Sequence, residues 1–289
     1  GLNDKHIKEI TKSIENKGFG FKLNEIIEIN SIKDRKLKTV YICGLGNKTK
    51  DVSALDFEKI GGRITELTKL KTKTSVIIDK EINNNENIMR LGYGSILGSY
   101  SFNKYKTNNF TNHKLSLIEI VSNNHTKLNK DFKRYASISD GVFYARDLVN
   151  EPSNVLFPKA YAQRIQKLRQ HGLKVEVLGE TKMKALKMHS LVGVGQGSQR
   201  ESQLVIMQWN GNKAKKTKPI CFVGKGVCFD SGGISIKPSN KMEEMIGDMG
   251  GSAAVVGTML SLAKRKAKVN AIGIVGLVEN MPDGKAQKP

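Results

Sequence analysis

Short apolar runs alternate with amphipathic segments along the first part of the chain. The runs Lys38–Gly46, Thr74–Asp79 and Leu115–Val121 are rich in apolar and β-branched residues and predict buried strands. Between them, apolar positions recur at helical spacing over Ala54–Lys71, and Ile88–Phe102 predicts a second helix that contains glycines. Alternation of strands and helices predicts a small α/β domain with a mostly parallel sheet.

The second part of the chain repeats this alternation after a longer amphipathic segment, Asp131–Leu148, which predicts a connecting helix. The polar run Ser122–Lys130 predicts a linker before it. Further strands are predicted at Leu173–Leu178, Gln203–Trp209, Pro219–Val223 and Val269–Leu277, and helices at Pro158–His171 and Gly251–Ala263. We therefore expect an α/β protein with an N-terminal domain over residues 1–126, a linker and connecting helix over 127–150, and a C-terminal domain with a central mixed sheet over 151–289.

The formal net charge is +21, from 48 Lys and Arg against 27 Asp and Glu. Such a charge attracts nucleic acids and anionic surfaces. Nearly all of the excess is lysine, however, and the arginines are scattered without interleaved aromatic residues, whereas base recognition favours clustered arginine. A compositional bias toward Lys, Asn and Ile explains the charge better, so nucleic-acid binding is the less favoured interpretation.

The cysteines and the apolar runs indicate the compartment. Cys43, Cys221 and Cys228 lie within apolar stretches and form no CxxC pair, which is typical of reduced thiols in the cytoplasm. No apolar run is as long as the ~20 residues that a membrane-spanning helix needs, and the polar first residues contain no apolar segment of a secretory signal. We expect a cytoplasmic protein without membrane association.

Most of the candidate chemistry lies in the segment Val223–Gly257, VGKGVCFDSGGISIKPSNKMEEMIGDMGGSAAVVG. A predicted strand leads into Gly224-Lys225-Gly226, Asp230 precedes a Ser-Gly-Gly turn, and Asp248 precedes two glycines at a predicted helix start. The carboxyl ends of buried strands are where α/β folds place ligands.

Each of these residues also has an ordinary structural explanation. Asp230 could pin a turn, Asp248 could cap a helix, and Lys225 could be a surface lysine. A phosphate-binding glycine loop is another alternative, but neither G-x-x-x-x-G-K-S/T nor GxGxxG occurs. Two carboxylates and two lysines among glycines favour a divalent-metal site, because carboxylates suit hard cations and a neighbouring dication lowers a lysine pKa enough for the neutral amine to bind.

The run VGKG-x4-DSGG-x3-KPS…M-x2-DMGG resembles the signature of the leucyl (cytosol) aminopeptidase family. Three further runs support the resemblance: Ala145–Asn154 (ARDLVNEPSN), Leu191–Gly197 (LVGVGQG) and Val278–Pro282 (VENMP). The similarity is strong over Tyr144–Pro289 and limited to general architecture over residues 1–125.

The resemblance implies roles for five residues. Lys225, Asp230 and Asp248 would be metal ligands, with Asp230 shared between two ions. Lys237 would be catalytic, stabilising the oxyanion that forms on the scissile carbonyl, and Met245 would line the pocket for the first side chain of the substrate. All five would contact the substrate.

The resemblance also implies cofactors and partners. The protein would use two divalent metal ions, manganese or zinc with magnesium as a third candidate, and bicarbonate in the complete enzyme. It would hydrolyse peptides from the N-terminus, with leucine-like residues preferred, and assemble as a homo-hexamer in the cytoplasm.

The sequence departs from the family pattern in one respect. The family's second motif, of the form NTDAEGR, supplies further carboxylates and an arginine and does not occur here. We therefore expect residues 151–289 to be an incomplete catalytic domain, and this chain to be inactive alone. The alternative functions are a non-catalytic relative and a nucleic-acid-binding protein that uses the basic surface.

Overall fold

The computed structural model describes residues 4–30, 39–46, 52–78, 84–107, 117–212 and 218–289 of the chain. The chain divides into two compact units. The first comprises Gly1–Ser99 with Asn108–Leu128, and the second comprises Tyr100–Thr107 with Asn129–Pro289. The segment Tyr100–Thr107 therefore belongs to the second unit, although it lies within the predicted N-terminal domain.

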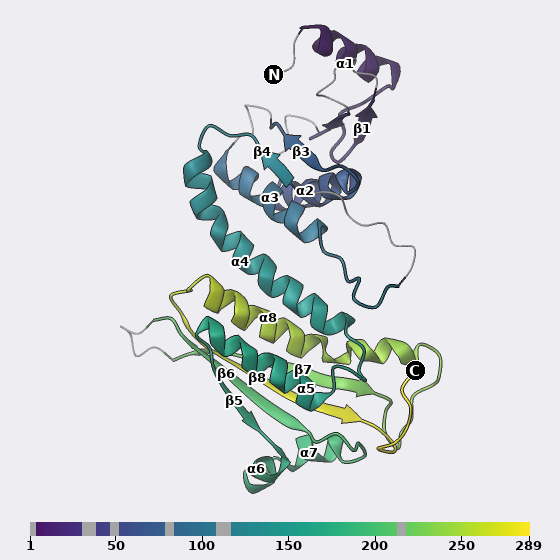
Figure 1. The fold of residues 1–289 in the computed structure, drawn as a ribbon, viewed down its shortest axis with the longest axis vertical. Coiled ribbons are helices and arrows are strands. Elements are labelled where there is room, and N and C mark those ends of the chain that lie inside the picture. Colours follow the sequence, from purple (N-terminus) through teal and green to yellow (C-terminus); the bar gives the residue numbers. More distant parts are fainter. Residues whose placement is uncertain (1–3, 31–38, 47–51, 79–83, 108–116, 213–217) are drawn as a thin grey trace. The chain divides into compact units, whose positions relative to one another are not determined.

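The first unit contains small sheets and helices (Figure 1). Its elements are α1 (Asp4–Asn16), β1 (Ile26–Ile29), β2 (Val40–Cys43), α2 (Ala54–Thr68), β3 (Lys73–Val76), α3 (Asn85–Gly98) and β4 (Leu117–Ile120). Within the described residues β1 pairs with β2 antiparallel and β3 pairs with β4 parallel, in two separate sheets. The prediction of a mostly parallel sheet is therefore wrong for the β1–β2 pair. Parallel pairing needs a crossover such as α3 supplies between β3 and β4, and only a short segment joins β1 to β2.

The α2–α3 pair forms the centre of this unit. Ser53 caps α2 in a reciprocal capping box with Asp56. Phe57 of α2 and Leu91 of α3 are buried in the same apolar cluster. The two helices approach so closely that a Cβ added to Gly94 would lie 1.9 Å from the Glu58 carbonyl oxygen, which explains the glycine at this position of α3.

The second unit is a mixed four-stranded sheet covered by helices (Figure 1). Its elements are α4 (His125–Asn150, which begins in the first unit), α5 (Pro158–Gln166), the 3-10 helix η1 (Lys167–His171), β5 (Lys174–Leu178), α6 (Glu180–Ala185), α7 (His189–Gly195), β6 (Gln203–Asn210), β7 (Ile220–Asp230), the 3-10 helix η2 (Met242–Met249), α8 (Gly250–Lys264) and β8 (Asn270–Asn280). The strand order is β5-β6-β8-β7, and of the three pairs in this described sheet β7–β8 is parallel and the other two are antiparallel. This confirms the predicted α/β class with a central mixed sheet.

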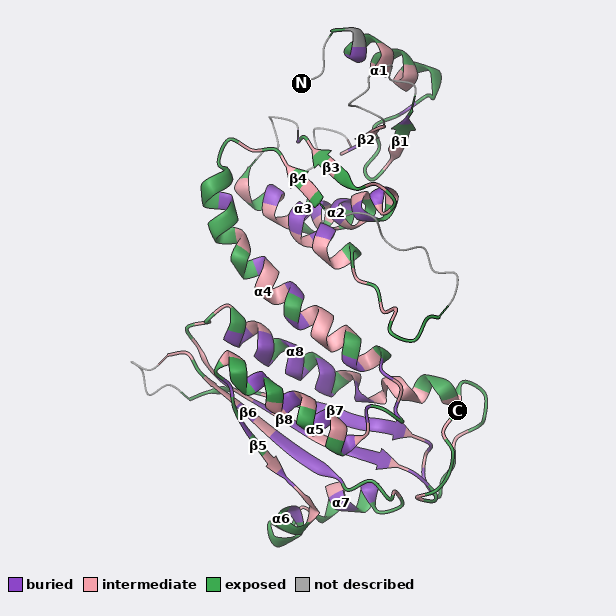
Figure 2. Cartoon of the chain, viewed as in Figure 1, coloured by how far each residue is buried: buried purple, intermediate pink, exposed green. Residues whose placement is uncertain are grey.

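Both faces of this sheet are covered. Val205 and Met207 of β6 are fully buried in the cluster that α5 and α8 share with the sheet, whereas the alternate residue Leu204 packs with Met183 of α6 and Val192 of α7. Figure 2 shows the buried residues of this unit concentrated along β6 and β8, the second half of β7 and the α8 helix.

Two predicted boundaries change. The predicted linker Ser122–Lys130 is largely helical, because α4 begins at His125. The predicted strand Pro219–Val223 continues to Asp230 as β7. Gly224 lies inside this strand because α8 packs against it: a Cβ there would lie 2.6 Å from the Gly251 carbonyl oxygen. The glycine therefore serves close strand–helix packing.

One helical stretch among the described residues, Met242–Lys264, is long and apolar enough to span a membrane, judged by length and composition. Core helices pass the same test. Val256 and Met259 of α8 have no exposed surface and pack in the main core of the second unit. Core packing therefore accounts for the apolar character of this stretch.

Candidate metal site and a second charged cluster

Strand β7 carries two of the predicted site residues, Lys225 and Asp230. Side chains of a regular strand alternate between faces, so residues five apart point to opposite faces. The pairing of β7 with β8 shifts register between Val227 and Phe229, which brings Asp230 opposite Asn280. A register shift of this kind inserts one residue and changes the alternation, as bulges beside functional sites often do.

The predicted site residues form two ion pairs. Lys225 Nζ lies 2.8 Å from Asp248 Oδ1, and Lys237 Nζ lies 2.8 Å from Asp230 Oδ2. Lys237 Nζ also lies 3.1 Å from the Met245 sulfur. The lysine side chains are 60% exposed for Lys225 and 37% exposed for Lys237, whereas both carboxylates are largely buried. The convergence of Lys225, Asp230 and Asp248 on a metal stays a prediction.

The loop after β7 positions Lys237. Gly232 and Gly233 have positive φ angles of 92° and 67°, a conformation that favours glycine. The Lys237 amide donates to the Ser231 carbonyl oxygen at 2.9 Å and closes the loop. The loop therefore brings Lys237 back to the strand end that carries Asp230.

The ordinary structural role predicted for each aspartate is found for Asp230 and not for Asp248. Asp230 Oδ1 accepts a hydrogen bond from the Gly232 amide at 3.0 Å, so this residue does pin the turn. Asp248 does not cap α8, whose N-cap residue Met249 makes no side-chain capping bond. Asp248 Oδ2 is buried and accepts no hydrogen bond from any residue that the structure describes. A buried carboxylate oxygen without a donor is costly, and a cation would satisfy it.

The unsatisfied oxygen of Asp248 is the structural feature that fits binding of a divalent metal. Asp230, Asp248 and the Lys225 amine would supply two carboxylates and one nitrogen. Among the described residues no three His, Cys, Asp or Glu side chains gather in a group that could hold a metal. The donor set present is therefore partial.

Asn280 is a residue of this site that sequence reasoning missed. Its Nδ2 donates to Asp230 Oδ1 at 2.8 Å. Burial opposes ionisation of Asp230, but the hydrogen bonds from Lys237, Gly232 and Asn280 outweigh it and lower the pKa of this carboxyl group below its usual 3.8. Only the VENMP run, noted for its family resemblance, marked Asn280 in the sequence.

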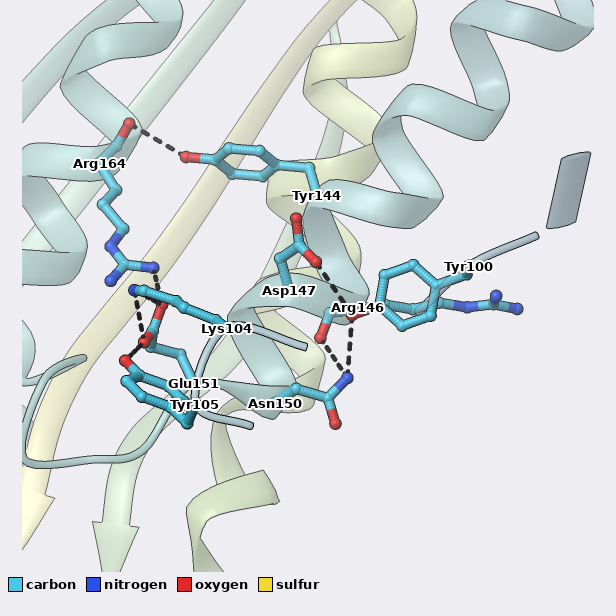
Figure 3. Close-up of polar contacts among 9 residues, drawn as sticks. All are labelled: Tyr100, Lys104, Tyr105, Tyr144, Arg146, Asp147, Asn150, Glu151 and Arg164. Atoms are coloured by element: carbon cyan, nitrogen blue, oxygen red, sulfur yellow. Dashed lines mark hydrogen bonds and ion pairs between the residues drawn. The ribbon is translucent and has the colours of Figure 1, made fainter. Parts of the chain in front are cut away.

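A second charged cluster surrounds Glu151, just beyond the end of α4 (Figure 3). The Glu151 side chain is 3% exposed. It contacts Lys104 Nζ at 2.9 Å with both oxygens, Arg164 Nη1 at 2.7 Å and the Tyr105 hydroxyl. Beside it, the Tyr100 hydroxyl donates to Asp147 Oδ1 at 3.0 Å and accepts from Asn150 Nδ2 at 3.0 Å.

A pocket of about 390 Å³ lies along this cluster, lined in part by Phe102, Tyr144 and Leu148. Burial raises the pKa of Tyr144 to about 12, so its hydroxyl stays protonated and donates to the Arg164 carbonyl oxygen. Sequence reasoning missed Glu151 as well. Its only signal was a charged residue before Pro152 in the ARDLVNEPSN run.

Comparison with known proteins identifies the family of both domains. The cytosol aminopeptidase family's catalytic-domain profile matches residues 143–289, and its N-terminal-domain profile matches residues 2–109. A probable cytosol aminopeptidase of Brucella anthropi is 46% identical over 292 residues, covering 98% of this chain and 58% of that protein. One from Rickettsia felis is 44% identical over 300 residues, covering 100% of this chain and 59% of that protein. The chain thus spans less than two thirds of these relatives.

Solved structures agree on the fold. The bottromycin maturation enzyme BotP in complex with Mn matches with a TM-score of 0.80 at 27% identity, over 95% of this chain and 58% of that one. A mutant of tomato leucine aminopeptidase matches with a TM-score of 0.79 at 21% identity, over 97% of this chain and 55% of that one. The second match shows similarity of fold alone.

Proposed function

The chain belongs to the cytosol aminopeptidase family, and we propose that the protein is a metal-dependent aminopeptidase releasing N-terminal residues, leucine-like ones by preference, from peptides. Because the chain covers 58–59% of the relatives' length, the activity is proposed for the complete gene product. The observation that carries the proposal is the pair of largely buried aspartates, Asp230 and Asp248, one of which has an oxygen without a donor.

Two divalent metal ions are the proposed cofactors. Asp230, Asp248 and the neutral amine of Lys225 would hold them. Manganese is favoured because the related BotP was solved in complex with Mn, and zinc and magnesium also suit such ligands. When bound, such ions polarise a carbonyl and lower the pKa of a bound water. Bicarbonate is proposed as a further component of the complete enzyme.

Lys237 supplies a charge for the transition state. Its ammonium group, held on the Asp230–Gly233 loop, would stabilise negative charge on the scissile carbonyl oxygen. Met245 lies against Lys237 Nζ at 3.1 Å, which supports its proposed place in the pocket for the first substrate side chain.

The proposed assembly is a homo-hexamer in the cytoplasm, which light scattering of the purified complete protein would test. The alternative function is nucleic-acid binding through the +21 net charge. Real phosphate contacts produce a binding constant that falls steeply with salt concentration. A DNA titration over several salt concentrations therefore separates the two functions, because a peptidase without DNA affinity gives no such slope.

The aminopeptidase proposal is tested with manganese and leucine p-nitroanilide on the complete gene product. We expect Mn²⁺ binding by calorimetry and release of nitroaniline, with both lost in Asp248→Asn. Asp140→Asn is the matched control, because Asp140 pairs with Lys264 in the same unit and outside the site. Binding and turnover in Asp248→Asn equal to those of the wild type would overturn the proposed site.

A further inference from the structure

The end of β8 lies beside the metal-site strand. Asn280 is the last residue of β8 and pairs in register with Asp230, the last residue of β7. Upstream of the register shift Val227 pairs with Val278, so an unshifted ladder would place Asp230 opposite Met281. The shift is therefore what sets an amide side chain against the carboxylate.

Asn280 contacts this strand end through both its side chain and its backbone. Its Nδ2 donates to Asp230 Oδ1 at 2.8 Å, and its carbonyl oxygen accepts from the Ser231 amide at 3.0 Å and the Ser231 hydroxyl at 2.7 Å. A Cβ added to Gly233 would lie 2.5 Å from Asn280 Oδ1. The turn after Asp230 is thus built around Asn280.

The two oxygens of Asp230 differ in what holds them. Oδ1 accepts from the Gly232 amide and from Asn280, which are fixed by the turn and by the strand. Oδ2 accepts from Lys237, whose side chain is long and 37% exposed. Because a carboxylate oxygen accepts about two hydrogen bonds, Oδ1 is saturated by rigid partners and Oδ2 has a partner that can move away.

We propose that Asn280 is a positioning residue of the metal site, which fixes Asp230 through Oδ1 and so presents Oδ2 to a divalent cation. This inference rests on the proposed function, since it assumes that Asp230 binds a metal. Partners that orient a metal ligand through a hydrogen bond contribute to affinity without touching the ion. Asn280 would act in this way on an aspartate ligand, as carboxylates and backbone carbonyls do on histidine ligands of other metal sites.

The test measures Mn²⁺ affinity of the complete gene product by calorimetry, independently of activity. Asn280→Ala and Asn280→Leu both remove the amide that donates to Asp230. Leucine is similar in size to asparagine, so the second variant leaves a smaller cavity than the first. We expect each to weaken Mn²⁺ binding about 10–100-fold, the usual effect of losing an orienting partner. Thermal unfolding of the metal-free variants checks that they are folded at the temperature of the titration.

Asn270→Ala is the matched control. Asn270 is the first residue of the same strand, and its side chain makes two hydrogen bonds, both with the Asn212 backbone, away from the aspartates of the site. We expect this variant to lose stability but to keep wild-type Mn²⁺ affinity. A purely structural role for Asn280 would make the two positions behave alike.

The outcomes separate the inference from the function on which it rests. Wild-type Mn²⁺ affinity in both Asn280 variants overturns the inference and leaves the aminopeptidase proposal standing. An equal loss of affinity in Asn270→Ala also overturns it, because the effect would then be general destabilisation. Absence of Mn²⁺ binding by the wild-type protein overturns both.

Discussion

Two charged clusters in the second unit use similar residues in opposite ways. In the Glu151 cluster the carboxylate is 3% exposed and both of its oxygens are held by Lys104, Tyr105 and Arg164. In the β7 cluster, which comprises Lys225, Asp230, Lys237, Met245 and Asp248, each aspartate pairs with one partly exposed lysine. Within the described part of the chain, Asp248 Oδ2 has no donor. The first cluster is closed and the second retains a free acceptor.

This difference separates a stabilising network from the proposed metal site. A fully satisfied buried network contributes to the folded state, because removing one partner leaves the others uncompensated. The lysines of the β7 cluster are partly exposed, and solvent weakens an ion pair at its exposed end, so these lysines can move at lower cost. We therefore expect substitutions at Glu151 to affect folding, and substitutions at Asp230 and Lys237 to affect metal binding and turnover.

The largest expected effect is on metal content, which should depend on Asp230 and not on Glu151. In the complete gene product Asp230→Ala removes the proposed shared metal ligand, so metal and turnover should be lost together. Glu151→Gln should keep its metal content. Metal analysis of both purified variants measures this, and retention of metal in Asp230→Ala would contradict the assignment of Asp230 as a ligand.

Lys237→Ala tests the division of labour within the β7 cluster. In the proposed function the ammonium group acts on the transition state, so turnover should fall about 10²–10³-fold while metal content is unchanged. Steady-state kinetics with leucine p-nitroanilide and metal analysis measure the two effects. Loss of metal in this variant would instead make Lys237 a structural residue of the site.

Glu151→Gln tests the closed cluster. The change removes the buried negative charge, leaves Arg164 and Lys104 without an anionic partner, and replaces one acceptor oxygen by a donor amide. We expect a loss of about 3 kcal/mol in the free energy of unfolding, at the lower end for a broken buried pair because both cations are partly solvated. Urea unfolding of this chain measures it. Asp140→Asn, at an exposed pair, should change stability by less than about 1 kcal/mol.

The smallest expected effect is the pH dependence of the contribution that Glu151 makes to the free energy of unfolding. Burial opposes ionisation, but the hydrogen bonds from Tyr105, Lys104 and Arg164 lower the pKa of Glu151 below its usual 4.5. The unfolded chain therefore binds this proton more readily, and the stabilisation is present above the ordinary pKa and lost as the pH falls through the folded value. The stability difference between wild type and Glu151→Gln should shrink between about pH 7 and about pH 3 in urea titrations. An unchanged difference would mean that Glu151 is not stabilised as a carboxylate.

The sequence by itself determined the α/β class and the order of most strands and helices, and it marked five charged or sulfur-containing candidates in one segment. These features are local, since alternating apolar periods and glycine-flanked charges can be recognised within short windows. Lys225, Asp230, Lys237, Met245 and Asp248 all lie within one such window. Family resemblance assigned roles to these five residues. The side chains that contact them in the folded protein could not be predicted from their spacing in the sequence.

Only the tertiary structure decided which groups meet. Glu151 contacts Lys104 across 47 residues, and Asp230 contacts Asn280 across 50. The full length of β7, its register shift against β8 and the antiparallel β1–β2 pair depend likewise on partners distant in the chain. Side-chain periodicity records which residues are buried, whereas pairing depends on which strand lies alongside, and that is settled only when the whole unit packs.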